Sequence, residues 1–129
     1  MPDLIEDAFA ALGEDCRGWL DLIPLDPAYR AFYPDGSSLD VFTDPRRMAA
    51  EIAGNIGAAE ARGYERFVEY VGQMYRLQIR SFIDRNLDSP TDLLTPDLAR
   101  LVALGGFGRL APKVNSFLKD PRTRRLFSF

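Results

Sequence analysis

The chain has 129 residues, enough for one domain with a modest core, and its 47% hydrophobic and 27% charged residues are typical of a globular protein. It contains no histidine, which excludes Ser-His-Asp and Cys-His nucleophile systems and disfavours ordinary zinc or copper sites, so we expect no metal. The lone Cys16 cannot form an internal disulfide, and no stretch resembles a signal peptide or a membrane-spanning helix, which together favour a cytoplasmic protein.

The charge is unevenly distributed along the chain. The formal net charge is −3, yet residues 98–129 contain seven basic residues and one acidic residue, so this segment carries +6 and the rest carries −9. A basic segment rich in Phe and Leu suits an anionic surface, such as lipid headgroups, a cofactor phosphate or an acidic partner. A solvated helical face explains the same pattern. Nucleic acid is disfavoured as a partner, because the segment contains no recognised docking module.

The first two predicted elements are a helix and a short sheet. Asp3, with a glutamate three residues later, is a capping pattern, and Gly13 predicts the end of this helix. Residues 20–43 then carry aromatic and β-branched residues in partial alternation. Because Pro34-Asp35-Gly36 lies between two such runs, we expect a β-hairpin over residues 29–43.

A short helix and a long helix follow. Asp44-Pro45 supplies an N-cap and a first-turn proline for the short helix. Residues 58–84 predict one amphipathic helix, about 27 residues and about 40 Å long. Gln78 interrupts its apolar face. The favoured interpretation is a polar residue that is hydrogen-bonded or at the periphery, and the alternative is a substrate contact. The apolar stripe comprises Tyr64, Phe67, Val68, Val71, Met74, Tyr75, Ile79 and Phe82.

The last third of the chain again predicts helices. Helical patterns cover residues 97–104 and 109–118, and Asp120-Pro121 begins a last short helix. Neither an internal repeat nor a linker divides the chain. We therefore predict a single piece of α+β class, mostly helical, with a sheet segment at about 20–43 and a helical subdomain over 44–129.

Residues 106–111 read Gly-x-Gly-x-x-Ala, the pattern of a dinucleotide-binding turn between a strand and a helix. The apolar residues that precede it have helical spacing rather than the pattern of a buried strand. Pro112 also falls where the phosphate-binding helix would run. We therefore interpret Gly105-Gly106 as a break between two helices, and expect no cofactor-binding residues in this chain.

Three stretches of the sequence carry a family resemblance. They are LIPLDPAYRAFYPDGSSLDVFTDPRRMAAEI at residues 22–52, GYERFVEYV at 63–71 and FLKDPRTRRLFSF at 117–129. In order and spacing they resemble bacterial-type phytoene desaturases, the FAD-dependent carotenoid desaturases of the amine-oxidase-like flavoproteins. The resemblance extends over nearly all of the chain.

The resemblance implies that this is the central, substrate-side region of a longer oxidoreductase that desaturates phytoene or a related polyene in carotenoid biosynthesis. Family members begin with a Gly-x-Gly-x-x-Gly segment that holds FAD and end with a second FAD-contacting segment, and neither pattern is found here. Met1 would then be an internal methionine, and Phe129 would lie within the family's F-S-F run. The cofactor implied for the parent is FAD, with none bound by this chain alone, and the Rossmann part is absent.

The partners implied are a long-chain polyene, the missing FAD-binding domain of the same protein and, peripherally, a membrane surface. A long apolar tunnel would hold the polyene. Its candidate lining residues, for which core packing is the alternative, are Tyr29, Phe32, Tyr33, Phe82, Leu94 and Phe117. The candidate membrane-facing residues, for which packing against the missing domains is the alternative, are Leu101, Leu104, Phe107 and Leu110.

Asp92 is the candidate catalytic residue. It occupies a loop position where related desaturases often carry a carboxylate near the tunnel, and it would accept the departing proton. A helix N-cap is the favoured alternative, because Thr91 and Asp92 follow Pro90. Some relatives carry an arginine three residues later, where this chain has Thr95, which weakens the acid–base role.

Two functions remain open for the chain by itself. The first is the substrate and membrane region of a FAD-dependent polyene desaturase, in which case catalysis needs the rest of the parent. The second is a stand-alone lipid-binding, carotenoid-binding or interaction protein without catalysis. In either case Arg30 is expected to pair with a carboxylate or to reach the missing domain.

Overall fold

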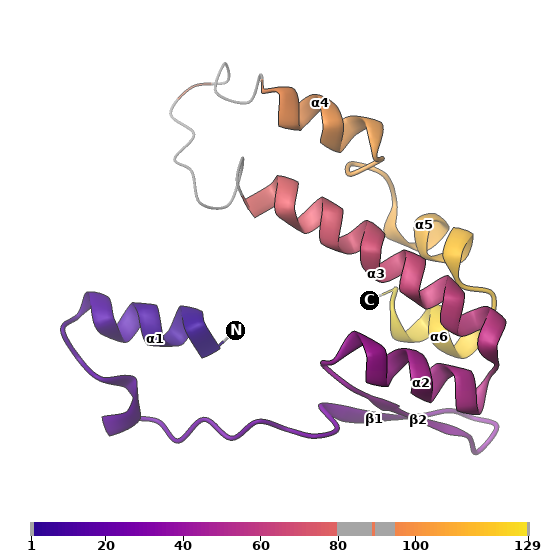
Figure 1. Cartoon of the computed structure of the whole chain (residues 1–129), viewed down its shortest axis with the longest axis horizontal. Coiled ribbons are helices and arrows are strands. Elements are labelled where there is room, and N and C mark those ends of the chain that lie inside the picture. The colour runs from indigo at the N-terminus through magenta and orange to yellow at the C-terminus, as the bar shows by residue number, and fades with distance from the viewer. Residues whose placement is uncertain (1, 80–88, 90–94, 129) are drawn as a thin grey trace.

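The computed structural model describes residues 2–79, 89 and 95–128, which form six α-helices, one short 3-10 helix and a two-stranded sheet (Figure 1). The predicted class, α+β and mostly helical, is confirmed. No helix within these residues is both long enough and apolar enough to cross a bilayer. In chain order the elements are α1 (Pro2–Ala11), η1 (Cys16–Gly18), β1 (Tyr29–Phe32), β2 (Ser38–Val41), α2 (Pro45–Asn55), α3 (Ala58–Gln78), α4 (Pro96–Ala103), α5 (Leu110–Phe117) and α6 (Pro121–Leu126).

The N-terminal helix α1 forms near the predicted position, but it begins at Pro2, so Asp3 lies in the first turn and is not the predicted N-cap. Its end is a Schellman motif: the Glu14 N–H donates to the Phe9 carbonyl at 3.0 Å, and Gly13 takes a φ of 77°. None of the helix's residues is buried. Figure 1 shows α1 at one side of the molecule, joined to the sheet by an extended segment.

The sheet is shorter than predicted, because residues 20–28 form no strand. Among the described residues the sheet contains only β1 and β2, and of residues 20–28 only Ala28 donates a backbone hydrogen bond to it, to the Val41 carbonyl at 2.8 Å. The hairpin itself is confirmed. Its turn is closed by the Gly36 N–H donating to the Tyr33 carbonyl at 3.0 Å, and Gly36 has a φ of 80°, which glycine adopts without strain.

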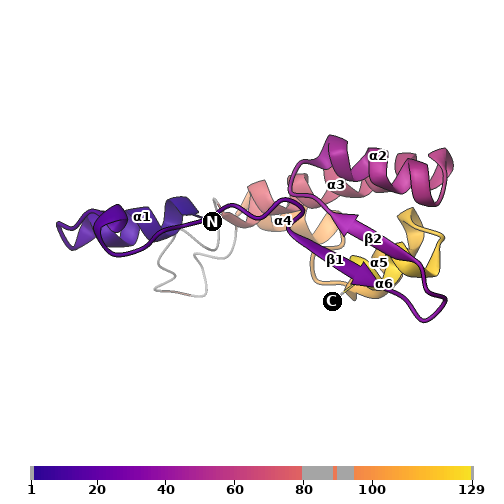
Figure 2. The same cartoon turned by 90° about the horizontal axis from the view of Figure 1, so that it is seen from below.

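The core lies between the inner face of the hairpin and helices α2, α3, α5 and α6 (Figure 2). Asp44 caps α2 as predicted, since its carboxylate accepts the Arg46 N–H at 2.7 Å. The Phe127 ring, close to the C-terminus, packs 5.1 Å from Tyr64 and 5.9 Å from Phe67. The buried core residues are Leu39, Met48, Ala49, Ile52, Ala61, Tyr64, Phe67, Val114, Leu118 and Leu126.

The long helix α3 packs against α2, α4 and α5. It runs from Ala58 to Gln78, and the predicted residues 80–84 lie outside the described part of the chain. Its first half packs on α2, α5 and α6, whereas its second half extends beyond α2 and α6 and lies beside α4 and the start of α5 (Figure 1). The second half of α3 is therefore only partly covered, and this is where the apolar grooves lie.

Candidate functional site

Two grooves follow the second half of α3. The first, here called the α3–α4 groove, has a volume of about 490 Å³ and is lined by Gln73, Arg76, Leu77, Arg100, Ala103 and Leu104. The second, called the α3–α5 groove, has about 310 Å³ and is lined by Tyr70, Val71, Met74, Tyr75, Gln78, Gly105, Gly106, Gly108, Arg109, Leu110 and Lys113. Gln78, the polar residue on the apolar stripe, thus contributes to a groove wall rather than to the core.

The turn after α4 lines the α3–α5 groove, and glycines allow it to approach α3 closely. The Gly106 N–H donates to the Leu101 carbonyl at 2.8 Å while Gly105 takes a φ of 79°, so α4 also ends in a Schellman motif. A Cβ at Gly106 would lie 2.6 Å from Leu101 Cδ1 and 2.9 Å from Met74 Cε. The Tyr70 hydroxyl fastens this turn to α3 by donating to the Leu104 carbonyl at 3.1 Å.

Cationic side chains contribute to the walls of both grooves. Arg76 and Arg100 flank the α3–α4 groove, and Arg100 also pairs with Asp97 at 2.9 Å. Arg109 and Lys113 flank the α3–α5 groove, where the Lys113 ammonium lies 4.5 Å from the Tyr70 ring centroid. Apolar walls with cations beside them suit a long apolar ligand near an anionic surface.

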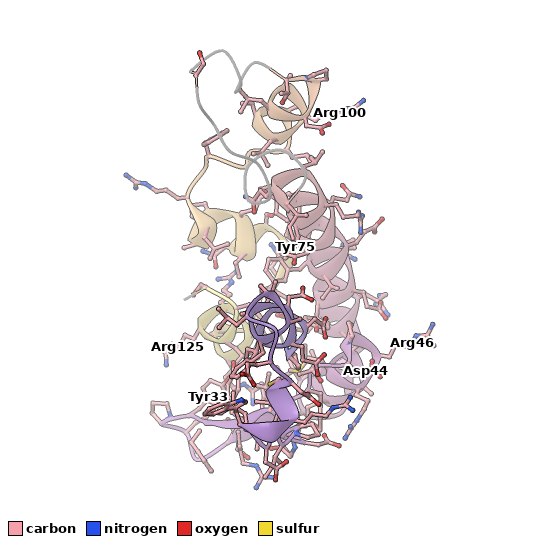
Figure 3. The ribbon with its side chains drawn as sticks, turned by 90° about the vertical axis from the view of Figure 1, so that its left-hand side faces the viewer. Tyr33, Asp44, Arg46, Tyr75, Arg100 and Arg125 are labelled. Carbon is pink, nitrogen blue, oxygen red and sulfur yellow. The ribbon has the colours of Figure 1, made fainter. Side chains whose placement is uncertain are left out.

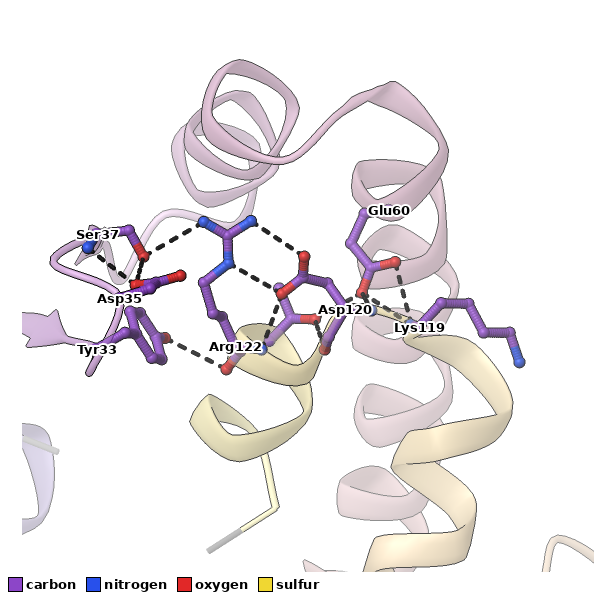
Figure 4. Close-up of polar contacts among 8 residues, drawn as sticks. Tyr33, Asp35, Ser37, Glu60, Lys119, Asp120 and Arg122 are labelled. Carbon is purple, nitrogen blue, oxygen red and sulfur yellow. Dashed lines mark hydrogen bonds and ion pairs between the residues drawn. The ribbon is translucent and has the colours of Figure 1, made fainter.

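A third pocket of about 440 Å³ lies at the other end of the molecule, between the hairpin turn and α6 (Figures 3 and 4). Arg122 donates to both carboxylate oxygens of Asp120 at 3.0 Å, which lowers the pKa of Asp120. The Tyr33 hydroxyl donates to the Arg122 carbonyl at 3.2 Å, and burial raises the pKa of Tyr33 although Arg122 opposes the rise. These groups satisfy one another, so the pocket is best explained as the docking of α6 on the hairpin.

Glu60 is a buried carboxylate that sequence reasoning missed. It is 8% exposed, and it accepts hydrogen bonds from the backbone N–H groups of Lys119 and Asp120 and from the Thr123 hydroxyl (Figure 4). An acid in the first turn of a helix normally indicates a dipole partner for its own helix. Here the carboxylate instead holds the start of α6, which no local signal reveals.

The candidate tunnel residues do not come together. Phe32 is 78% exposed on the outer face of the hairpin, and Tyr29 is 46% exposed at its open end. Tyr33 belongs to the pocket beside α6. Phe117 lies in the core, with its ring 6.0 Å from Phe67 and 5.5 Å from Tyr70. The predicted alternative of core packing therefore describes Phe117 and Tyr33, which both pack against the core, whereas Tyr29 and Phe32 lie at the hairpin surface.

The candidate membrane-facing residues divide into exposed and covered ones. Phe107 is 72% exposed and Leu110 is 48% exposed, so both lie at the surface. Leu104 is half-buried in the wall of the α3–α4 groove. Leu101 corrects the prediction: it is 3% exposed, because it packs under the Gly106 turn and against α3, and it does not face outward.

Asp92, Phe82 and Leu94 lie outside the described residues. Thr95 is the N-cap of α4, since its hydroxyl accepts the Leu98 N–H at 3.1 Å. Arg30 pairs with a carboxylate as expected, donating from Nη2 to Asp40 Oδ2 at 2.9 Å on the outer face of the hairpin.

The glycine-rich stretch after α4 does not fit a dinucleotide-binding turn. The Gly-x-Gly-x-x-Ala stretch follows helix α4 rather than a strand, and Gly105-Gly106 ends that helix, so the interpretation as a break between helices is confirmed. In the same part of the chain, no three acidic or cysteine side chains gather in a metal-binding group.

Comparisons with known proteins bear on the predicted resemblance. No protein-family model matches the sequence. Over all 129 residues the chain is 55% identical to a phytoene dehydrogenase of Streptomyces griseus, covering 25% of that protein. It is 29% identical to a carotenoid 3,4-desaturase of Haloarcula japonica, covering 26%, and 28% identical to a zeta-carotene-forming phytoene desaturase of Myxococcus xanthus, covering 25%. The resemblance is confirmed, and the chain spans about a quarter of the length of the curated relatives it matches.

Proposed function

We propose that this chain, which is homologous along its whole length to phytoene dehydrogenases and carotenoid desaturases, is the substrate-side part of an oxidoreductase that desaturates phytoene or a related long polyene. The observation that carries this proposal is 55% identity over 129 residues to a protein named phytoene dehydrogenase. Flavin, the implied cofactor, supplies the redox chemistry and would be held by parts of the parent protein outside these residues.

The grooves beside α3 support a role in holding the substrate. A long polyene has no hydrogen-bonding groups, so a protein can orient it only by apolar contact and shape. Both grooves offer such contact through residues such as Leu77, Leu104, Met74 and Tyr75. Asp92 stays the proposed proton acceptor of the parent enzyme, with a structural capping role as its alternative.

An occluding substitution tests this function in the full-length protein. Ala103→Trp would fill the α3–α4 groove, and we expect it to raise the KM for phytoene by about tenfold while flavin content stays unchanged. Ala53→Trp, at an exposed position of α2, is the matched control and should change the KM less than twofold. Turnover is followed by the visible absorbance of the product, whose system of conjugated double bonds is longer than that of the substrate.

The opposite outcomes separate the two candidate functions. Full-length protein that carries flavin but turns over neither phytoene nor a related polyene would refute the desaturase proposal. Tight carotenoid binding without turnover would instead favour the lipid-binding or carotenoid-binding alternative. Equal KM values for both tryptophan variants would remove the α3–α4 groove from the substrate path and leave the activity itself in place.

We also propose that the surface beside the α3–α5 groove docks on a membrane, from which so apolar a substrate would be drawn. Phe107, Leu110 and Tyr75 are exposed there, at 72%, 48% and 56%. Arg109 and Lys113 form no ion pair with any described residue, so both are available to lipid phosphates. Exposed apolar side chains beside such cations are typical of interfacial binding.

Charge reversal tests this docking. We expect the full-length Arg109→Glu, Lys113→Glu variant to lose affinity for phosphatidylserine-containing vesicles by about tenfold or more in a flotation assay, because each cation near such a surface contributes about 1 kcal/mol. The control, Arg46→Glu with Arg62→Glu, changes the net charge equally at exposed positions away from this surface. Equal flotation of both variants, or equal binding of the unchanged protein to neutral vesicles, would contradict the proposal.

A further inference from the structure

Gly106 lies in the turn after α4, where the space around the residue, rather than its backbone conformation, requires glycine. Its φ is not positive, unlike the φ of 79° at Gly105, so its backbone does not itself demand glycine. A Cβ there would nevertheless lie 2.6 Å from Leu101 Cδ1 and 2.9 Å from Met74 Cε. Both distances are well below the contact distance of two carbon atoms, so a side chain at this position must displace a neighbour.

Met74 is the neighbour that has room to move. Leu101 is 3% exposed and packs under the turn, so strain at Leu101 passes on to Met74 or to the turn itself. Met74 is half-buried, and the added Cβ would meet the terminal Cε of its flexible thioether chain. Because Met74 also lines the α3–α5 groove, the open space beside it is the groove. A larger residue at position 106 would therefore push Met74 into the groove.

The turn is fastened to α3, which prevents it from moving aside instead. The Tyr70 hydroxyl donates to the Leu104 carbonyl at 3.1 Å. The Gly106 N–H donates to the Leu101 carbonyl at 2.8 Å. Tyr70 is itself held by its ring, which packs 5.5 Å from the ring of Phe117. Since these contacts keep the turn against α3, the strain of a side chain at position 106 falls on the groove.

We propose that Gly106 is a positioning residue for the substrate. By leaving room for Met74 beside Leu101, it keeps the α3–α5 groove wide enough for a long polyene. The inference rests on the proposed function in that it takes this groove as part of the substrate path. Phytoene and related polyenes carry methyl branches along the chain, so a displaced thioether in the groove leaves too little width for them. Gly106 thus acts through Met74, which lines the groove.

Polyene binding to the full-length protein tests this role, with lycopene as the probe because its visible absorbance changes on binding. Gly106→Ala should weaken lycopene binding by about tenfold and raise the KM for phytoene by a similar factor, while kcat and flavin content stay unchanged. Gly72→Ala, the matched control in α3, meets no atom closer than 3.5 Å and should change the affinity less than twofold. Unchanged lycopene affinity of Gly106→Ala would overturn the inference.

Removing the displaced side chain separates a role in binding from a role in stability alone. Gly106→Ala combined with Met74→Ala should bring the lycopene affinity back to within about twofold of the unchanged protein, although the double variant has lost a half-buried side chain. If Gly106 served only stability, the second change would add to the damage of the first. A double variant that binds as weakly as Gly106→Ala, or that folds no better, would contradict the role proposed for Met74.

The same measurements distinguish failure of this inference from failure of the proposed function. Lycopene bound without turnover of phytoene would refute the desaturase function alone, because the variants can still be compared by affinity. Absence of polyene binding by the unchanged full-length protein would overturn both. Normal turnover with equal affinities for all variants would refute only the role of Gly106.

Discussion

Replacing Gly63 with alanine should destabilise the protein by about 2 kcal/mol or more, although alanine is the better helix former. Gly63 lies where α3 meets the end of α5, and a Cβ added there would stand 2.5 Å from the backbone oxygen of Phe117. That atom belongs to the main chain, so it cannot rotate aside as the end of a side chain would. The helices must separate, and the surrounding core loses its packing.

The same substitution elsewhere in α3 provides the control. At Gly72 the nearest atom to an added Cβ is Arg76 Nη1, at an ordinary contact distance of 3.5 Å. Gly72→Ala should therefore stabilise the protein by up to about 1 kcal/mol through helix propensity alone. Chemical denaturation of both variants gives the two free energies of unfolding. A neutral or stabilising Gly63→Ala would show that α3 and α5 do not approach as closely as the structure places them.

Removing the Glu60 carboxylate is the second large effect. We expect Glu60→Ala to lower the free energy of unfolding by about 3 kcal/mol or more, because it leaves the part-buried N–H groups of Lys119 and Asp120 without an acceptor. Thr123, which is 0% exposed, loses an acceptor for its hydroxyl in the same step. The start of α6 would keep its own cap, its contacts with the hairpin and the hydrogen bond from Arg124 to the Leu118 carbonyl.

Two controls isolate this effect. Glu65→Ala removes an exposed glutamate from the same helix and should change stability by less than about 0.5 kcal/mol. Glu60→Ala combined with Thr123→Val should cost less than the sum of the two single changes, because the hydroxyl and the carboxylate lose the same hydrogen bond. Additive losses would show that the two side chains do not interact.

Local signals in the sequence were sufficient for much of the fold. Asp44-Pro45 and Asp120-Pro121 begin α2 and α6, and each aspartate caps its helix by accepting the N–H two residues later. Gly13 ends α1, and Gly36 closes the hairpin, at the predicted positions. These features depend on contacts within about five residues, so the residue types alone are enough to indicate them.

The candidate site was less predictable. Leu104 and Leu110 do line the grooves beside α3, since helical periodicity shows which apolar residues share a face. Periodicity does not show which member of a face is covered by the next turn, and so Leu101 was wrongly expected at the surface. Arg76 and Arg100, which flank the α3–α4 groove, were missed because a helical cation is normally a solvated residue.

By itself the sequence predicted the resemblance to phytoene desaturases, through three motifs in order, and the places where most helices and the hairpin begin and end. Only the tertiary structure decided that Glu60 holds the start of α6 and that Gly63 lets the end of α5 approach α3 closely. The physical reason is separation along the chain. Glu60 and its partners are 59 to 63 residues apart, and such contacts arise from packing geometry that no local pattern encodes.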